Sequence, residues 1–298
     1  MKINKTFLAA ALVAAVFTSC ETKENSHRET QPFNMLNYVT DGTEENYSIG
    51  TASISIEYLG ESASSLSVRK VVMAGGSEQS FDVNALTNKN VASGMGFELS
   101  PTSVATNGMS DINISLLGGS AWIQQWNLFY NFKSGNEKVF GMPAISFYFS
   151  ATKVTKALNG EPVLSTEEVA KNRYQITINE KDVNKSTRTL NLYVAGAAFM
   201  EGMPAMNMVF KDIPFSIENG RLTFAADRLV PSVLTGDNAD KEVPNEKFPI
   251  TDLEGSGLLG DNITLKYSCT PTIGEDNSTT YNVVSTLKFR LQSSSSQQ

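Results

Sequence analysis

Few residues of this chain carry side chains suited to catalysis. The 298 residues include one histidine, His27, and two cysteines, Cys20 and Cys269. Because His27 lies in a polar stretch near the N-terminus, a Ser-His-Asp triad or a Cys-His dyad has no base to activate its nucleophile. A zinc site built from several histidine and cysteine ligands is excluded for the same reason. The sequence therefore predicts a protein that is not an enzyme and that binds no metal and no cofactor.

Carboxylates are the remaining groups with catalytic potential, because a glycosidase needs only two of them. Asp212, Asp252 and Glu254 are examples among the 31 acidic residues. Unpaired acids on an acidic chain are usually solvated, so a carboxylate-based glycosidase is the least favoured hypothesis for the function. The formal net charge of −7 also argues against a nucleic-acid interface, which requires clustered lysine and arginine.

Aromatic residues are the best candidates for contact with a ligand. Trp122 and Trp126 are separated by an even number of residues, so an extended strand places both on one side. Flat aromatic side chains of this kind suit a platform for sugars. Tyr130 follows in the same register, and Tyr267 occupies the matching place in an internal repeat described below. We take these four residues as candidate ligand contacts, with packing in the core as the more common role of such side chains.

The first twenty residues predict export and lipid attachment. Two lysines precede an apolar run over residues 7–17, and small residues then lead to Cys20. The run is shorter than the roughly 20 apolar residues of a membrane-spanning helix, so it indicates a cleaved signal peptide. A cysteine directly after small residues at this place is the attachment point for a lipid. We therefore expect residues 1–19 to be removed and residues 20–45 to form a lipidated, polar tether.

This N-terminus resembles those of Bacteroidales-type lipoproteins. In those proteins an acidic patch just after the lipidated cysteine often marks export to the outer face, and Glu21 and Glu24 follow Cys20 here. The resemblance implies an outer-membrane protein anchored through acyl chains such as palmitate and displayed on the cell surface, with the periplasmic face as the alternative. If Cys20 carries the lipid, Cys269 has no partner and no intramolecular disulfide forms.

Beyond residue 46 the dominant period of apolar residues is two, which is the period of a β-strand. The alternation is clearest in residues 52–58, 174–178, 190–194, 222–224 and 287–291. Strands with one polar and one apolar side suit antiparallel sheets that close over a single core. The best helix candidate is short, at residues 165–170, where Ser165 and Glu168 form a capping box.

An internal repeat indicates two related halves. Residues 117–130 align with residues 254–267 without a gap. In the strand that follows, the apolar positions also correspond: Trp126, Leu128, Tyr130 and Phe132 match Ile263, Leu265, Tyr267 and Cys269. We expect each copy to continue into a last strand, at residues 145–149 in the first half and 287–291 in the second.

A second, shorter repeat links Gly141-Met142-Pro143-Ala144 with Gly202-Met203-Pro204-Ala205. Its spacing differs from that of the longer repeat, so it does not move the boundary between the halves. We interpret it as two hairpins with the same turn, because glycine supplies an unusual φ and proline stiffens the entry into a strand.

One long segment resembles a known family. Residues 199–206, 210–215 and 218–224, with the later hairpin at residues 261–267, look like the calycin-like (lipocalin-like) β-barrel domains of Bacteroidales lipoproteins. The resemblance implies an up-and-down barrel of about eight strands that closes on itself. The family brings no catalytic residues to this chain.

These observations predict an all-β protein with two tandem antiparallel up-and-down barrels of about seven to eight strands each. We expect a first calycin-like domain over residues 46–155, a linker with a short helix over 156–171, a second domain over 172–292 and a disordered tail over 293–298. The predicted function is a non-catalytic binding or interaction module of the cell envelope, for a glycan or a small apolar ligand. The alternative is a structural component of a surface assembly or adhesin, with another surface protein as its partner. An open barrel interior favours the first function, and filled barrels with an exposed apolar patch favour the second.

Overall fold

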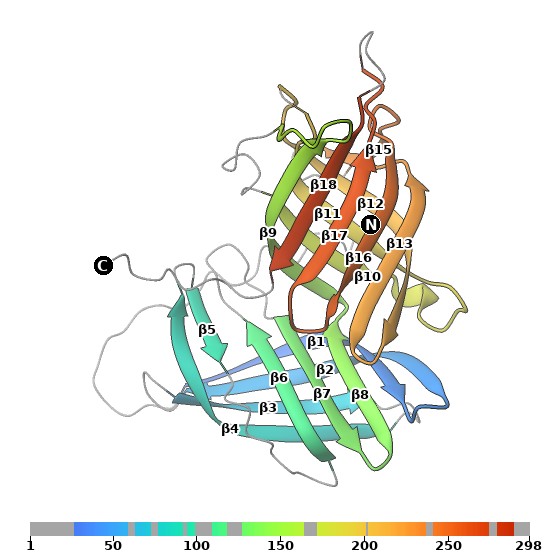
Figure 1. Ribbon diagram of the computed structural model, residues 1–298. Coiled ribbons are helices and arrows are strands. Elements are labelled where there is room, and N and C mark those ends of the chain that lie inside the picture. The colour runs from blue at the N-terminus through green and yellow to red at the C-terminus, as the bar shows by residue number, and fades with distance from the viewer. Residues whose placement is uncertain are drawn as a thin grey trace, which may run out of the picture.

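The computed structural model describes most of the chain beyond residue 26. The described ranges are residues 27–58, 63–72, 77–91, 94–98, 109–117, 127–163, 172–200, 202–236, 241–273 and 279–288. Within them every regular element is a β-strand, apart from the single 3-10 turn η1 (Glu180–Asp182). The strands form two antiparallel sheets (Figure 1), which confirms the predicted all-β antiparallel architecture. No helix in these ranges is long and apolar enough to cross a membrane.

The first sheet is curled and has eight strands in the order β5-β4-β3-β2-β1-β8-β7-β6. Its strands are β1 (His27–Thr40), β2 (Glu45–Tyr58), β3 (Ala63–Val72), β4 (Glu78–Val91), β5 (Gly94–Glu98), β6 (Met109–Leu117), β7 (Asn127–Ser134) and β8 (Glu137–Pro143). The edge strands β5 and β6 come near each other, but no backbone ladder joins them within the described residues (Figure 1). The sheet therefore has an open seam between β5 and β6.

The second sheet closes into a barrel. Its strands are β9 (Ile145–Lys156), β10 (Arg173–Ile178), β11 (Arg188–Ala197), β12 (Met206–Glu218), β13 (Arg221–Leu229), β14 (Ser232–Thr235), β15 (Lys241–Pro244), β16 (Ile250–Leu258), β17 (Ile263–Cys269) and β18 (Tyr281–Lys288). Because β11 pairs with β12 as well as with β10, the strands β9–β13 and β16–β18 form a ring of eight. The hairpin β14–β15 extends from β12. The second half thus has the predicted up-and-down barrel, and the first half has an open version of it.

Three strands bend at bulges where a residue other than glycine adopts a left-handed backbone conformation. Lys70, Asp212 and Asp252 have φ of 59°, 55° and 52°, and each lies where the strand register shifts. A bulge increases the local twist and bends the strand, which helps a sheet to curl. Asp212 and Asp252, two of the carboxylates considered for catalysis, therefore shape β12 and β16, and Glu254 lies exposed beyond the second of these bulges.

The barrel stands on the outer face of the first sheet, with the short turns of the barrel at the contact (Figure 1). Tyr47 on β2 makes the central contact, because its hydroxyl donates to the carbonyl of Ile217 (3.2 Å) and accepts from the N–H of the same residue (3.0 Å). The guanidinium of Arg188 lies 3.6 Å from the centroid of the Tyr47 ring. One continuous apolar core then runs from Leu36 and Met142 of the first sheet into the barrel. The two sheets therefore share a core.

The chain divides between the two sheets at a different point from the expected one. β1 begins at His27, so residues 27–45 contribute a strand and a turn to the first sheet. β9, expected as the last strand of the first half, pairs with β10 and β18 in the barrel. The crossing point is Ala144, whose N–H bonds to the carbonyl of Asn34 and whose carbonyl accepts from Ile178. The predicted helix at 165–170 and the tail at 293–298 lie outside the described residues.

The longer repeat is confirmed where both copies are described. The matching side chains on β7 and β17 are all buried: Leu128, Tyr130 and Phe132, and Leu265, Tyr267 and Cys269. We expected both copies of the shorter repeat to form the same turn, and this is wrong for the first copy. Gly202 has φ of 75° in a turn, whereas Gly141 lies within β8 and has no left-handed φ.

The contact between Tyr47 and Ile217 yields a prediction for stability. β11 pairs with β12 only as far as Phe215, so without the tyrosine hydroxyl the backbone groups of Ile217 lose a partner. We expect Tyr47→Phe to lower the free energy of unfolding by about 1–3 kcal/mol, measured by urea denaturation. Tyr281→Phe is the matched control, because the Tyr281 hydroxyl makes no hydrogen bond among the described residues. Equal losses in the two variants would contradict this role of Tyr47.

Candidate functional site

The interior of the curled first sheet has a polar group at its centre. Asn37 on β1 is only 1% exposed, and its Oδ1 accepts a hydrogen bond from the hydroxyl of Tyr130 on β7. Gly141 on β8 pairs with both residues and lies between them. A Cβ at position 141 would lie 2.2 Å from the Tyr130 ring, so only glycine lets this ring cross the middle strand to reach Asn37.

Side chains from opposite parts of the sheet meet in this interior. The ring of Phe81 on β4 lies 5.7 Å from that of Tyr130 and 5.9 Å from that of Phe132, although four strands separate β4 from β7 in the sheet. Gln79, also on β4, donates from Nε2 to the Ser134 hydroxyl at 3.1 Å. The first sheet is therefore curled tightly enough for its two sides to pack across the concave face.

Among the described residues of this interior, two buried polar atoms have no hydrogen-bond partner. They are Nδ2 of Asn37, a donor, and Oε1 of Gln79, an acceptor. Leaving such a group unpaired costs about 1–3 kcal/mol, so native proteins usually pair buried polar atoms with protein, water or a ligand. The concave face of the first sheet therefore has unused hydrogen-bonding capacity.

The interior of the closed barrel differs, because its hydroxyl groups bond to one another. Ser285 lies 2.8 Å from both the Thr152 and the Tyr174 hydroxyl, and Thr152 donates to Ser150 at 3.1 Å. The one unpartnered atom recorded on the barrel side is Oδ1 of Asn172, at the rim just before β10. The barrel interior is thus largely satisfied by its own side chains.

Aromatic residues cover the end of the barrel that lies far from the first sheet. Phe199, after β11, and Phe248, before β16, are both buried, with ring centroids 6.1 Å apart. Phe199 also packs edge-on against Tyr267 at 5.8 Å, and its N–H lies 3.2 Å from the sulfur of Met203. These contacts place side chains from two connecting loops over the barrel core.

Burial raises the pKa of the described tyrosines and of the free cysteine in the two interiors, so these groups stay neutral even well above physiological pH. It raises the pKa of Tyr148 to about 12, and it raises the pKa of Tyr130 and of Tyr267 well above the ordinary value for tyrosine. Burial also raises the pKa of the free cysteine Cys269 to about 12. Since the thiolate is the nucleophile, a thiol with so high a pKa is a poor one. The tyrosine hydroxyls of these interiors act as neutral hydrogen-bonding groups.

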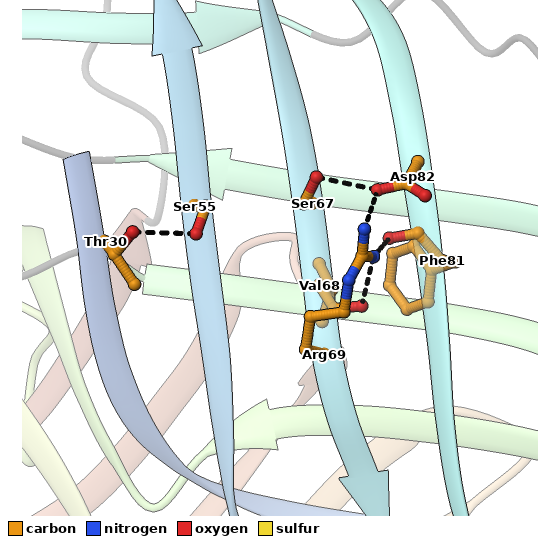
Figure 2. Close-up of polar contacts among 7 residues, drawn as sticks. All are labelled: Thr30, Ser55, Ser67, Val68, Arg69, Phe81 and Asp82. Atoms are coloured by element: carbon orange, nitrogen blue, oxygen red, sulfur yellow. Dashed lines mark hydrogen bonds and ion pairs between the residues drawn. The ribbon is translucent and has the colours of Figure 1, made fainter. Parts of the chain in front are cut away.

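The outer face of β1–β4 carries a second polar arrangement (Figure 2). Thr30, Ser55, Ser67 and Asp82 pair in register across the four strands. Asp82 accepts from Ser67 (2.6 Å) and from Arg69 (2.5 Å), and the guanidinium of Arg69 also donates to the carbonyls of Val68 (3.2 Å) and Phe81 (3.1 Å). Arg69 thus supports the bulge at the neighbouring Lys70. The row of polar residues across β1–β4 therefore has a structural role.

The structure describes only some of the ligand contacts predicted from the sequence. Trp122 and Trp126 lie outside the described residues, as does the lipidation site Cys20. Tyr130 and Tyr267 are both buried, Tyr130 in the interior of the first sheet and Tyr267 in the barrel. The structure therefore does not bring these two tyrosines together, and each one packs against the core of its own sheet.

Sequence reasoning missed Asn37 and Gln79. The only signal at Asn37 is a polar residue inside an otherwise apolar run, Met35-Leu36-Asn37-Tyr38-Val39. Its bonding partner Tyr130 lies 93 residues away, and nothing in the spacing links the two. Gln79 lies in a polar segment and is brought inside only by the curl of the sheet.

Comparison with solved structures finds a proposed outer membrane protein from Bacteroides fragilis. The alignment covers 87% of this chain and 97% of that one, at 12% sequence identity and a TM-score of 0.28. At this TM-score the alignment carries no argument about fold or function. No protein-family model and no curated protein matches the sequence.

The close contact between Gly141 and Tyr130 gives a second prediction. We expect Gly141→Ala to lower the free energy of unfolding by about 1–3 kcal/mol in urea, because the added Cβ displaces the ring. In a Tyr130→Leu background the same change is expected to cost less than half as much, since the smaller side chain leaves room. An equal cost in both backgrounds would show that the ring is not what requires glycine at position 141.

Proposed function

We propose that the protein is a cell-envelope lipoprotein that acts as a non-catalytic binding module. In this proposal the curled first sheet receives the ligand and the closed barrel is its base. The observation that supports it is the contrast between the two interiors. Asn37 and Gln79 keep unpartnered polar atoms in the first sheet, whereas the barrel hydroxyls of Thr152, Tyr174 and Ser285 bond to one another.

The open seam supports the same assignment. A ring of paired strands gives no lateral route into the barrel, whereas the first sheet ends in two edge strands without a ladder between them. The predicted aromatic contact Trp126 directly precedes β7, the strand that carries Tyr130. The ligand classes that suit these groups are a glycan, for its hydroxyls, and a small apolar ligand, for the aromatic rings.

The proposed location is the outer membrane, with the chain anchored by a lipid on Cys20 and displayed on the cell surface. The support for this part of the proposal is the N-terminal sequence alone: a short apolar run, small residues and a cysteine, followed by Glu21 and Glu24. Because β1 starts at His27, only residues 21–26 separate the proposed anchor from the first sheet.

A surface-assembly or adhesin component is the second candidate function. Apolar side chains are exposed on the loops and the hairpin at the covered end of the barrel, where Leu158 is 98% exposed. The other exposed large apolar side chains at this end are Val230, Val243 and Ile273, whereas Ile145, Leu258 and Val284 are exposed elsewhere on the barrel. Exposed apolar groups that lie near one another favour a protein partner.

The lipid anchor is tested with Cys20→Ala. We expect the wild-type protein to incorporate radioactive palmitate and to sediment with membranes, and the variant to lose both properties, because the thiol is the attachment point. Ser19→Ala is the matched control and should keep both. A wild-type protein that takes up no palmitate, or a variant that stays with the membrane, would contradict the lipoprotein assignment.

The binding function is tested on the mature chain with a panel of glycans and lipids. We expect Trp122→Ala and Trp126→Ala to weaken binding at least about tenfold if the indole rings contact the ligand. Trp122→Phe and Trp126→Phe are the controls, since a flat ring is kept. Absence of binding by the wild-type protein, together with capture of a surface protein by the loop end, would favour the assembly function.

A further inference from the structure

The amide of Asn37 needs a second partner. Its side chain is fixed in the centre of the first sheet by the hydrogen bond from Tyr130, and it is 99% shielded from solvent. Tyr130 engages only one of the two polar atoms of the amide, so the other stays unpaired whichever way the amide is turned. Leucine at position 37 together with phenylalanine at position 130 would fill similar volumes without any unpaired group, so the apolar packing of the sheet does not explain the asparagine.

The surroundings restrict what the partner is. Among the described residues that meet in this interior, the buried side chains beside Asn37, Tyr130 and Gln79 are apolar: Met35, Val39, Val68, Phe81, Phe132 and Val139. A charged ligand would lose its hydration there without gaining an opposite charge, which is strongly unfavourable. These described neighbours favour a neutral partner.

The partner must also offer both kinds of hydrogen-bonding atom. Asn37 Nδ2 requires an acceptor and Gln79 Oε1 requires a donor. Asn37 is hydrogen-bonded to Tyr130, and Gln79 is hydrogen-bonded to Ser134. Tyr130 and Ser134 are four residues apart on β7, which is about 13 Å along a strand. The rings of Phe81 and Phe132 lie between these points and present apolar surfaces. Hydroxyl groups serve as donor and acceptor alike, and a molecule with hydroxyls around an apolar face fits both features.

We propose that the interior of the first sheet binds a neutral, hydroxylated ligand of the saccharide class, with one ligand oxygen accepting a hydrogen bond from Asn37 beside Tyr130. This proposal rests on the proposed binding function and specifies the ligand and the residues that recognise it. Asn37 is the specificity-determining residue, and Tyr130 positions the Asn37 amide.

A purely structural role for Asn37 makes different predictions. If the amide only anchors Tyr130, removing the pair leaves binding of any ligand unchanged. If the amide binds a ligand, the double variant Asn37→Leu/Tyr130→Phe loses the ligand contact. The same variant also removes the unpaired amide group of Asn37 together with the Tyr130 hydroxyl that bonds to it. Replacing both members of such a pair by apolar groups of similar shape is nearly neutral or stabilising.

The experiment measures saccharide binding and stability in the same variants. Calorimetry is carried out on the mature chain with methyl β-glucoside, cellobiose, maltose and lactose, with galacturonic acid as the charged match and decanol as the apolar match. We expect a neutral saccharide to bind the wild-type protein and the double variant Asn37→Leu/Tyr130→Phe to bind it at least about tenfold more weakly. We also expect the urea midpoint of the variant, without ligand, to equal or exceed that of the wild type.

The control double variant is Tyr174→Phe/Ser285→Ala, which removes a satisfied hydroxyl pair from the closed barrel. We expect it to lower the urea midpoint and to leave saccharide binding unchanged. This result would separate a general loss of buried polar contacts from the loss of a ligand site.

Each other outcome overturns the proposal in a distinct way. Unchanged saccharide binding in the Asn37 variant would place the ligand elsewhere and leave the binding function standing. Binding of decanol or galacturonic acid in place of the neutral sugars would overturn the ligand class alone. No binding of any compound by the wild-type protein, with a water molecule ordered at Asn37 in a crystal structure, would overturn both this proposal and the binding function.

Discussion

The hydrogen bonds between Tyr47 and the backbone of Ile217 hold the two sheets in one body. In the described part of the first sheet no backbone ladder joins the edge strands β5 and β6, so they do not stabilise each other through main-chain hydrogen bonds. The support of this sheet comes from the outer face, where Tyr47, Phe140 and Met142 join the barrel core. The barrel needs this contact less, because its ring of strands pairs every member on both sides. The closed barrel therefore stabilises the first sheet through this contact.

The same asymmetry appears in the polar groups of the two interiors. In the closed barrel the hydroxyls of Thr152, Tyr174 and Ser285 form hydrogen bonds with one another, and large aromatic side chains pack in the interior beside them. The curled sheet packs Phe81 against Tyr130 in a similar way, but it keeps the amides of Asn37 and Gln79 only half bonded. A protein tolerates such a cost where a ligand or a water molecule recovers it.

The strands that the sequence predicted well are those with one wet and one buried side. In β10, Tyr174, Ile176 and Ile178 are buried while the residues between them are not, and this alternation is visible in the sequence. β1 was missed because residues 35–40 are buried on both sides, between the sheet interior and the barrel. A strand covered on two faces has no polar and apolar alternation to detect.

Sheet membership and the candidate site depend on contacts between distant residues, which strand patterns do not reveal. β9 looks like any alternating strand, and it joins the barrel because Ala144 bridges Asn34 and Ile178 at the crossing point. The repeat correctly matched Tyr130 with Tyr267, but the two tyrosines serve different interiors. Gly141 was noticed for its backbone freedom, whereas its role is to make room for a ring from the next strand.

The pairing of β9 with β18 has a consequence for the order in which the protein folds. β9 ends at Lys156, and its partner β18 begins at Tyr281, so the ring closes only when the last strand meets the first. Contacts between residues so far apart in sequence are slow to form, because the loop entropy is lost before the ring gains its closing ladder. Until β18 has been synthesised, β9 and β17 each have one unpaired edge. The barrel strands can thus pair with wrong partners during synthesis, and a chaperone that shields strand edges would serve this protein at that stage.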